Sequence, residues 1–277
     1  CDRMMDMGFM PQLRDILEVI PNKRQNLLFS ATFPERVEKL SGEFLLWPTK
    51  IEVSPQATPV ATVIQRKTSV PNIRTKLHFV AHLLENEYRE ERALVFVRTK
   101  EQAEQISKYL ERTTSGGVRG LHSNKGQNTR LHSMSLFREG SIRILVSTDV
   151  ASRGIDVPET KLVINCTVPR NSSDYVHRIG RTGRAFSEGI AHTLYDPSEK
   201  LYLESIEKHL PSDNKIEECS LPASIQIEET PSWEAKQMAK DIDYQKRKAD
   251  PNYKGAFHEK KNKKPSTNKT SNRRSRK

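Results

Sequence analysis

The sequence lacks long hydrophobic runs and contains little cysteine, and both absences restrict the class of protein. No stretch of its 277 residues approaches the roughly 18 to 20 apolar residues that a membrane-spanning helix requires. Its three cysteines, at positions 1, 166 and 219, are odd in number and lack the spacing of metal ligands. We therefore expect a cytoplasmic protein with reduced thiols, without membrane contact and without a bound metal of its own.

The chain also lacks an initiating methionine and a signal peptide, since it opens with "CDRMMDMGF". We therefore expect it to begin inside a longer protein. A phosphate-binding loop of the pattern G-x-x-x-x-G-K-S/T is likewise missing from the 277 residues.

Positive charge is present in excess, but it is concentrated at one end of the chain. Residues 251–277 contribute +9 of the net charge of +11, from ten lysines and arginines against Glu259, so the preceding residues carry only +2. This basic tail (251–277) has almost no large apolar residues and cannot build a core. We therefore expect it to be disordered and to act as an electrostatic anchor.

Short apolar runs alternate with segments of helical spacing from about residue 60 to about residue 212. Ile73, Leu77 and Leu84 repeat on one helical face, and "ALVFV" (93–97) predicts a buried strand. Further strands are expected at 117–123, 142–148, 161–165 and 190–195, and further helices near 103–110, 127–139 and 172–179. The alternation predicts an α/β fold with a parallel sheet covered on both faces. Ligands of such sheets bind beyond the carboxyl ends of the strands.

The first 56 residues predict an additional α/β fragment. We expect helices near 9–20 and 34–46, strands at 26–32 and 50–53, and Trp47 in the core. The turn-rich "SPQATP" (54–59) then predicts a linker between domains.

The pattern of strands and helices decays after about residue 212. A helix is expected within 231–251, with Ser232 as its N-cap and Pro251 as its stop. Trp233 either docks this helix against the preceding domain or is exposed to solvent, and the sequence leaves both alternatives open.

Two motifs combine groups that suit phosphate chemistry. "STDVASRGID" (147–156) leaves a predicted strand with hydroxyl, carboxylate and glycine residues, and "HRIGRTGR" (177–184) places three arginines among two glycines. The first motif also has a purely structural interpretation, because Thr, Asp and Gly are favoured in loops. The second could be solvated surface, where runs of arginine usually lie. The order and spacing of the two motifs favour a phosphate site.

These motifs, together with "FSAT" (29–32), "LVFVRTK" (94–100) and "QNTR" (127–130), resemble those of the DEAD-box ATP-dependent RNA helicases, in particular the bacterial RhlE-like type. The resemblance covers residues 1 to about 210. It implies the end of a first RecA-like lobe in 1–56, a complete second RecA-like lobe in 57–212, and an extension in 213–277. The opening residues are similar to the end of the Asp-Glu-x-Asp box, with Cys1 in place of the usual alanine.

The resemblance implies an ATP site in the second lobe. Its expected residues are Gly154, Asp156, Arg181 and Arg184, of which Arg181 and Arg184 are the catalytic pair and Arg184 is the arginine finger. A guanidinium suits the γ-phosphoryl group because it offers a planar fork of donors and does not lose its proton. Mg²⁺ would accompany ATP, with most of its ligands in sequence that precedes Asp2.

The resemblance also implies an RNA site and contacts between the lobes. RNA is expected to contact Arg98, Thr99, Gln127, Arg130 and Thr148, while Asp2, Ser30, Thr32, Arg153 and His177 couple the lobes. Helix N-termini and strand ends present free N–H groups to phosphate oxygens. Because such contacts read the backbone, we expect single-stranded RNA or short duplexes to bind with low sequence specificity. A solvated first helical turn stays open as the alternative for Gln127 and Arg130.

The implied activity of the full-length protein is ATP-dependent unwinding or remodelling of RNA duplexes. Because this chain lacks the phosphate-binding loop, we expect it to be inactive alone. Two alternatives stay open: a non-enzymatic RNA-binding module, and a DNA helicase of a neighbouring branch, which "SAT" and "RGID" in this order disfavour. The sequence identifies no ribosomal or RNA-degradation partner.

Deletion of the basic tail tests its role as an electrostatic anchor. Each phosphate that the tail neutralises contributes about −0.7 to the slope of log affinity against log salt on single-stranded RNA. Removal of residues 251–277 should therefore flatten that slope, measured by fluorescence polarisation over a salt series. A slope that the deletion leaves unchanged would show that the tail does not bind RNA.

Overall fold

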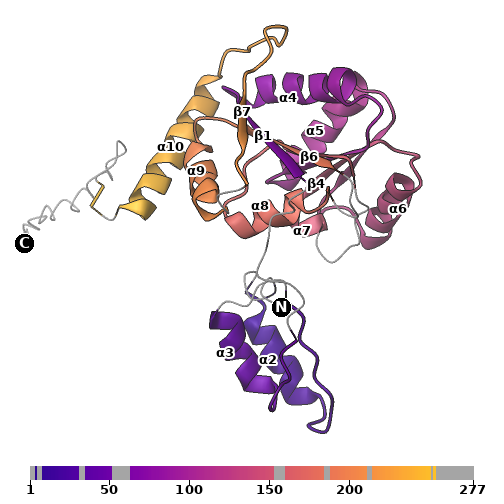
Figure 1. Ribbon diagram of the computed structural model, residues 1–277, viewed down its shortest axis with the longest axis vertical. Helices are drawn as coiled ribbons and strands as arrows, with labels where there is room; N and C mark the ends of the chain where they lie inside the picture. The colour runs from indigo at the N-terminus through magenta and orange to yellow at the C-terminus, as the bar shows by residue number, and fades with distance from the viewer. Residues whose placement is uncertain are drawn as a thin grey trace, which may run out of the picture.

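The computed structural model describes residues 4, 8–30, 35–51, 63–152, 160–183, 188–210, 214–250 and 252–253 (Figure 1). Of the basic tail, only residues 252–253 belong to this part of the chain, so Pro251 lies outside it. No helix within it is both long and apolar enough to cross a membrane.

A parallel sheet forms the centre of the molecule, as the alternating pattern predicts. Its order is β3-β4-β2-β5-β6-β1-β7, and every pair of neighbouring strands is parallel. The strands are β1 (Val63–Ser69), β2 (Ala93–Val97), β3 (Val118–Leu121), β4 (Ile144–Thr148), β5 (Leu162–Asn165), β6 (Gly189–Tyr195) and β7 (Glu217–Cys219). All their carboxyl ends therefore meet at one edge, which we call the carboxyl edge.

Helices cover both faces of the sheet (Figure 1). One face carries α4 (Ile73–His82), its continuation η1 (Leu83–Glu87) and α5 (Lys100–Thr113). The other carries α6 (Gln127–Arg138), α7 (Asp149–Ser152), α8 (Ser172–Ile179) and α9 (Lys200–His209). Successive β2 residues supply the two cores, since Val95 packs on the α4–α5 side and Phe96 on the α6 side. The predicted α/β fold is confirmed.

The N-terminal residues form helices α2 (Met10–Val19) and α3 (Glu35–Phe44), as expected. They are joined by an ion pair of 2.9 Å between Arg14 Nη2 and Glu43 Oε1. Asn26 Nδ2 also donates to the carbonyl oxygen of Phe44.

The strands expected in this N-terminal segment are not formed by its described residues. Residues 26–30 and 50–51 have no strand structure, and Leu27, Phe29 and Ile51 are exposed. A buried parallel strand needs neighbours in a sheet, and the described residues up to 51 contain no strand that could supply them. The prediction that Trp47 lies in the core is also wrong, since its side chain is 98% exposed.

The residues after β6 and α9 are integrated with the parallel sheet. Strand β7 pairs with β1 at the edge of the sheet, and helix α10 (Ser232–Ala249) contacts the turn that precedes α9 (Figure 1). The prediction of Ser232 as N-cap is wrong by one residue, since Pro231 precedes the helix and Ser232 begins it.

Polar contacts hold the extension in place. Asn72 Nδ2 donates to Glu228 O at 2.7 Å, the Ile73 amide donates to Glu234 Oε1 at 2.8 Å, and Gln245 Nε2 donates to Ser198 O at 2.7 Å. Trp233 is 66% exposed, so the helix is not docked through its indole.

A buried histidine in the sheet gives the fold a dependence on pH. His192 of β6 is within 2.9 Å of Thr68 Oγ1 through Nε2, and its ring packs edge to face on Phe79. Burial, assisted by the charge of Arg66, lowers the pKa of His192 to about 4.

This pKa predicts a loss of stability in mild acid. The unfolded chain binds the proton near the ordinary value of 6.5, so the contribution is complete above that pH and is lost as the pH falls towards about 4. The full loss is on the order of 3 kcal/mol in the free energy of unfolding. Urea unfolding followed by circular dichroism should show a flatter pH dependence for His192→Gln. Equal pH dependence in both proteins would assign the loss to another group.

Candidate nucleotide and nucleic-acid site

The residues expected to bind RNA gather at the carboxyl edge of the sheet. Arg98 and Thr99 follow β2, Thr148 ends β4, and Gln127 begins α6. The arginine-rich segment continues beyond the C-terminal end of α8, where residues 181–183 contact the amino ends of β5 and β6. The topology therefore brings together RNA-binding candidates that are far apart in sequence, and Arg178 of α8 reaches the same edge through its side chain.

Local interactions fix the start and end of α8. Asn171 is its N-cap, and its side-chain oxygen accepts from the Asp174 amide at 2.8 Å. The helix ends at Gly180, after which the Thr160 amide donates to Arg181 O at 3.1 Å and Thr182 Oγ1 donates to Lys161 O. The Arg181 backbone is thereby tied to the segment that leads into β5.

Two glycines are required by the backbone of this turn. Gly183 has φ +71°, in the left-handed region that side chains rarely adopt. A Cβ added at Gly189 would meet Thr182 Oγ1 and the Gly183 backbone nitrogen. The small residues therefore serve the close passage of two backbone segments at the end of α8.

Arg178 links the two signature motifs, although it is not among the site residues expected from the sequence. Its Nε and Nη2 donate to the two carboxylate oxygens of Asp149 at 2.6 and 2.8 Å. Nη1 donates to Thr167 O at 2.6 Å, and the guanidinium lies over the Phe96 ring. The side chain is only 1% exposed. Its spacing from the buried Tyr175 and Ile179 is the signal that could have placed it on the inner face of α8.

Arg98 is held by a buried ionic cluster. Its Nη2 donates to Glu199 Oε1 at 2.9 Å and to Val168 O at 3.0 Å. Glu199 also accepts from the Val168 amide and from Lys76, which in turn pairs with Asp196 at 2.9 Å. Burial opposes the charge of Lys76, but Glu199 and Asp196 outweigh it and raise its pKa. The cluster therefore fixes the orientation of the Arg98 guanidinium, which is expected to contact RNA.

The other residues expected to bind RNA differ in their exposure and in the hydrogen bonds that their side chains already make. Thr99 caps α5, with Oγ1 accepting from the Gln102 amide, and is exposed. Arg130 donates to Gln127 Oε1 at 3.0 Å and to Ala151 O at 2.9 Å. Thr148 is buried at the end of β4.

Arg130 therefore joins the start of α6 to α7, the helix that follows Thr148. The assignment of Arg98, Thr99, Gln127, Arg130 and Thr148 to RNA binding stays a prediction.

Several of the expected site residues lie outside the described part of the chain. These are Asp2, Thr32, Arg153, Gly154, Asp156 and Arg184. Ser30, His177 and Arg181 are described, each partly exposed and each with interactions of its own. Within the described residues, no cluster of three or more His, Cys, Asp or Glu side chains could hold a metal ion.

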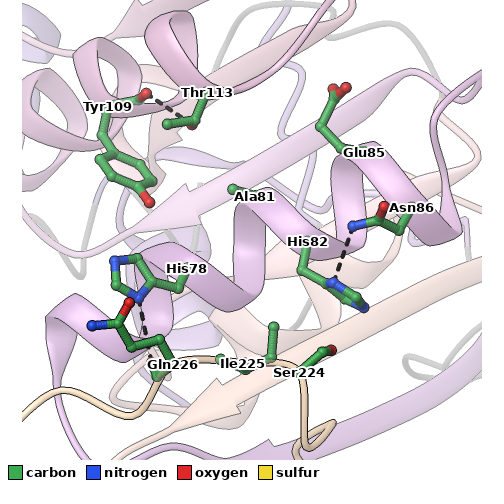
Figure 2. Close-up of a pocket in the computed structure, with 10 residues that line it drawn as sticks. All are labelled: His78, Ala81, His82, Glu85, Asn86, Tyr109, Thr113, Ser224, Ile225 and Gln226. Carbon is green, nitrogen blue, oxygen red and sulfur yellow. Dashed lines mark hydrogen bonds between the residues drawn. The ribbon is translucent and has the colours of Figure 1, made fainter.

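A groove of about 380 Å³ lies on the helices of the α4–α5 face (Figure 2). It is lined by His78, His82 and Tyr109, among others, and closed on one side by residues 224–226. Helices of a parallel α/β sheet run back from the carboxyl edge, and these side chains belong to the later turns of α4 and α5. The groove is therefore separate from Arg98 and Thr99 at the start of α5, and it lies on the opposite face of the sheet from α8, which precedes Arg181.

Replacement of Arg178 tests whether it holds the two motifs together. Arg178→Ala leaves the Asp149 carboxylate, whose side chain is 20% exposed, without its partner, so the free energy of unfolding should fall by about 3 kcal/mol, the lower end of the cost of breaking a buried pair. Arg178→Lys keeps the charge but loses the two-pronged contact and should recover only part of this loss. Arg181→Ala, a partly exposed arginine of the same motif, is the matched control and should cost much less. A small effect of Arg178→Ala in urea unfolding would contradict the linking role.

Comparisons with known proteins agree with this arrangement. The family described as "Helicase conserved C-terminal domain" matches residues 75–186, and "DEAD/DEAH box helicase" matches residues 1–40. The chain is 42% identical over 203 residues to DEAD-box ATP-dependent RNA helicase 5 of Arabidopsis thaliana, covering 72% of this chain and 37% of that protein. It is 39% identical over 208 residues to ATP-dependent RNA helicase dbp3 of Sclerotinia sclerotiorum, covering 72% and 35%. The chain thus spans about a third of the length of these relatives.

The fold is similar to that of a solved helicase. S. cerevisiae Dbp5 bound to RNA and ADP BeF3 matches with a TM-score of 0.68 and 25% identity, over 87% of this chain and 61% of that chain. The two family matches occur in the order that the motifs predict, and the parallel sheet agrees with them. The chain therefore belongs to the DEAD-box RNA helicase family, and it corresponds to the C-terminal portion of such a protein.

Proposed function

We propose that the full-length protein is an ATP-dependent helicase that opens or remodels short RNA duplexes. The observation that carries the proposal is the contact of the buried Arg178 with Asp149, which joins the arginine-rich motif to the start of α7, directly after β4 at the carboxyl edge. Membership of the family supports the same activity. The bacterial RhlE-like type and a cytoplasmic location stay predictions from the sequence.

Arg181 and Arg184 supply the positive charge for ATP hydrolysis in this proposal. Negative charge spreads over the γ-phosphoryl oxygens in the transition state, so catalysis depends on positioning and on electrostatic stabilisation. Arg181 follows directly after the end of α8, whose position Arg178 fixes. Gly154 would allow close approach of the backbone to the nucleotide, and Asp156 would accept a hydrogen bond from a sugar hydroxyl.

Mg²⁺ would neutralise phosphate charge when it is bound with ATP. The described residues offer no cluster of carboxylates for it, so its ligands would come from the first lobe. The second lobe would therefore contribute arginines to the nucleotide rather than metal ligands.

RNA would bind along the carboxyl edge at Arg98, Thr99, Gln127, Arg130 and Thr148. The cluster around Glu199 holds the Arg98 guanidinium, which lowers the entropy lost on contact with a phosphate. Such contacts would favour single strands of any sequence. ATP can favour a closed, RNA-gripping state only through a higher affinity for that state, and we propose that Arg181 and Arg184 provide this difference.

The arginine finger is tested in the full-length protein. Arg184→Ala removes charge stabilisation that acts mainly in the transition state, so kcat for ATP hydrolysis should fall by about 10³-fold or more. ATP binding should weaken less, because phosphate contacts in the first lobe persist. Arg184→Lys retains charge without the planar fork and should restore little. A kcat within a few-fold of wild type for Arg184→Ala would contradict the assignment.

The RNA site is tested by the opposite kinetic pattern. Arg130→Ala removes one phosphate contact, so the RNA concentration for half-maximal stimulation should rise while kcat at saturating RNA mostly persists. RNA-stimulated ATP hydrolysis over an RNA titration measures both quantities. A fall in kcat without a shift in the RNA requirement would remove Arg130 from the RNA site.

A further inference from the structure

Helix α10 presents an ordered row of aromatic and basic side chains to solvent. We call the set Trp233, Lys236, Lys240, Tyr244 and Lys248 the α10 stripe. The spacing of three or four residues places all five on one face of the helix. All five are exposed, Trp233 by 66% and Tyr244 by 63%.

The opposite face of α10 is anchored, so the α10 stripe has a fixed orientation. Glu234 and Gln245 are buried, and they bond to the Ile73 amide and to Ser198 O, respectively. These two contacts lie near the two ends of the helix. An aromatic ring on a docked helix loses little conformational entropy when a flat ligand stacks on it.

The acidic residues of α10 that the structure describes do not neutralise the α10 stripe. Glu234 is buried against α4, and Asp243 pairs with Arg247 at 2.9 Å. Asp241 is partly buried and accepts from Gln237. Three lysines and two exposed rings therefore share one surface. Interleaved basic and aromatic side chains are typical of surfaces that bind single-stranded nucleic acid.

The position of α10 connects the α10 stripe to the expected RNA site. Gln245 contacts Ser198 in the turn that follows β6, at the carboxyl edge. The next residue, Glu199, accepts from Arg98 at the end of β2. Asn72, which follows the carboxyl end of β1, holds the segment that leads into α10. The helix thus lies at the same edge of the sheet as the residues expected to bind RNA.

We propose that the α10 stripe binds the single-stranded RNA that leaves the site at the carboxyl edge. Trp233 and Tyr244 would each stack on a base, and the lysines would contact phosphates between them. The two aromatic residues are separated by 11 positions, or about 16 Å along the helix, which leaves room for the phosphates between two stacked bases. The proposal rests on the proposed RNA-binding function.

The fluorescence of Trp233 can report RNA binding directly, because Trp47 is the only other tryptophan in the sequence. With Trp47→Phe as the background in the 277-residue chain, oligouridylate should quench the emission of Trp233 by stacking. Heparin, a polyanion without bases, should produce a much smaller change at matched occupancy. Equal quenching by heparin would show a surface that recognises charge alone and would overturn the stacking role. Binding of oligouridylate detected by polarisation, without any change in emission, would also overturn it.

Substitutions separate the aromatic and basic contributions. Trp233→Ala and Tyr244→Ala should each weaken oligouridylate binding by about tenfold, the scale of one stacked base, whereas Trp233→Phe should retain most of the affinity. Lys240→Ala should reduce the magnitude of the salt slope by about 0.7. Lys246→Ala is the matched control, since this exposed lysine lies off the α10 stripe and over the Tyr253 ring. Equal effects of Lys240→Ala and Lys246→Ala would contradict a defined surface.

The same binding assay distinguishes failure of the α10 stripe from failure of the proposed function. Weaker binding in Arg130→Ala, with no effect of Trp233→Ala or Tyr244→Ala, would overturn the α10 stripe and leave the RNA site at the carboxyl edge intact. No binding of oligouridylate to any form of the chain would overturn both. Circular dichroism of each variant confirms that its fold is retained.

Discussion

The buried contact between Arg178 and Asp149 is the interaction on which the site depends. It joins α8 to the start of α7, directly after β4, and a third donor of the same guanidinium reaches Thr167 O beyond β5. A buried charge without its partner is costly, so the segments that supply these groups are held in one arrangement. The position of Arg181, just beyond the end of α8, follows from that arrangement.

A second buried group, Glu199, extends this order across the sheet. It holds Arg98 at the end of β2 and Lys76 in α4, while the adjacent Ser198 holds α10 through Gln245. The C-terminal extension is therefore part of the framework that orients the expected RNA site. If RNA binds both Arg98 and the α10 stripe, it contacts two surfaces that a single turn of the chain keeps in a fixed relation.

Much of the second lobe could be predicted from the sequence, because its apolar runs and helical faces are buried as their periodicity requires. Val95 and Phe96, for example, fill cores on opposite faces of the sheet. Prediction failed where burial depends on distant partners: "NLLFS" is apolar, yet the described residues around it provide no neighbouring strand. The buried roles of Arg178 and Glu199 were missed because charge in a sequence indicates exposure, whereas their burial depends on partners that only the fold brings close.

The central claim is that the Arg178 contact links the expected RNA site at the carboxyl edge to the arginines expected to bind ATP beyond α8, and its most direct test is the coupling between the two ligands. In the full-length protein, the affinity for single-stranded RNA should be measured with a non-hydrolysable ATP analogue, with ADP and without nucleotide. The account predicts tighter RNA binding with the analogue than with ADP, and an equal gain in analogue affinity when RNA is bound, since coupling is reciprocal. RNA affinity that is the same in all three states would contradict it.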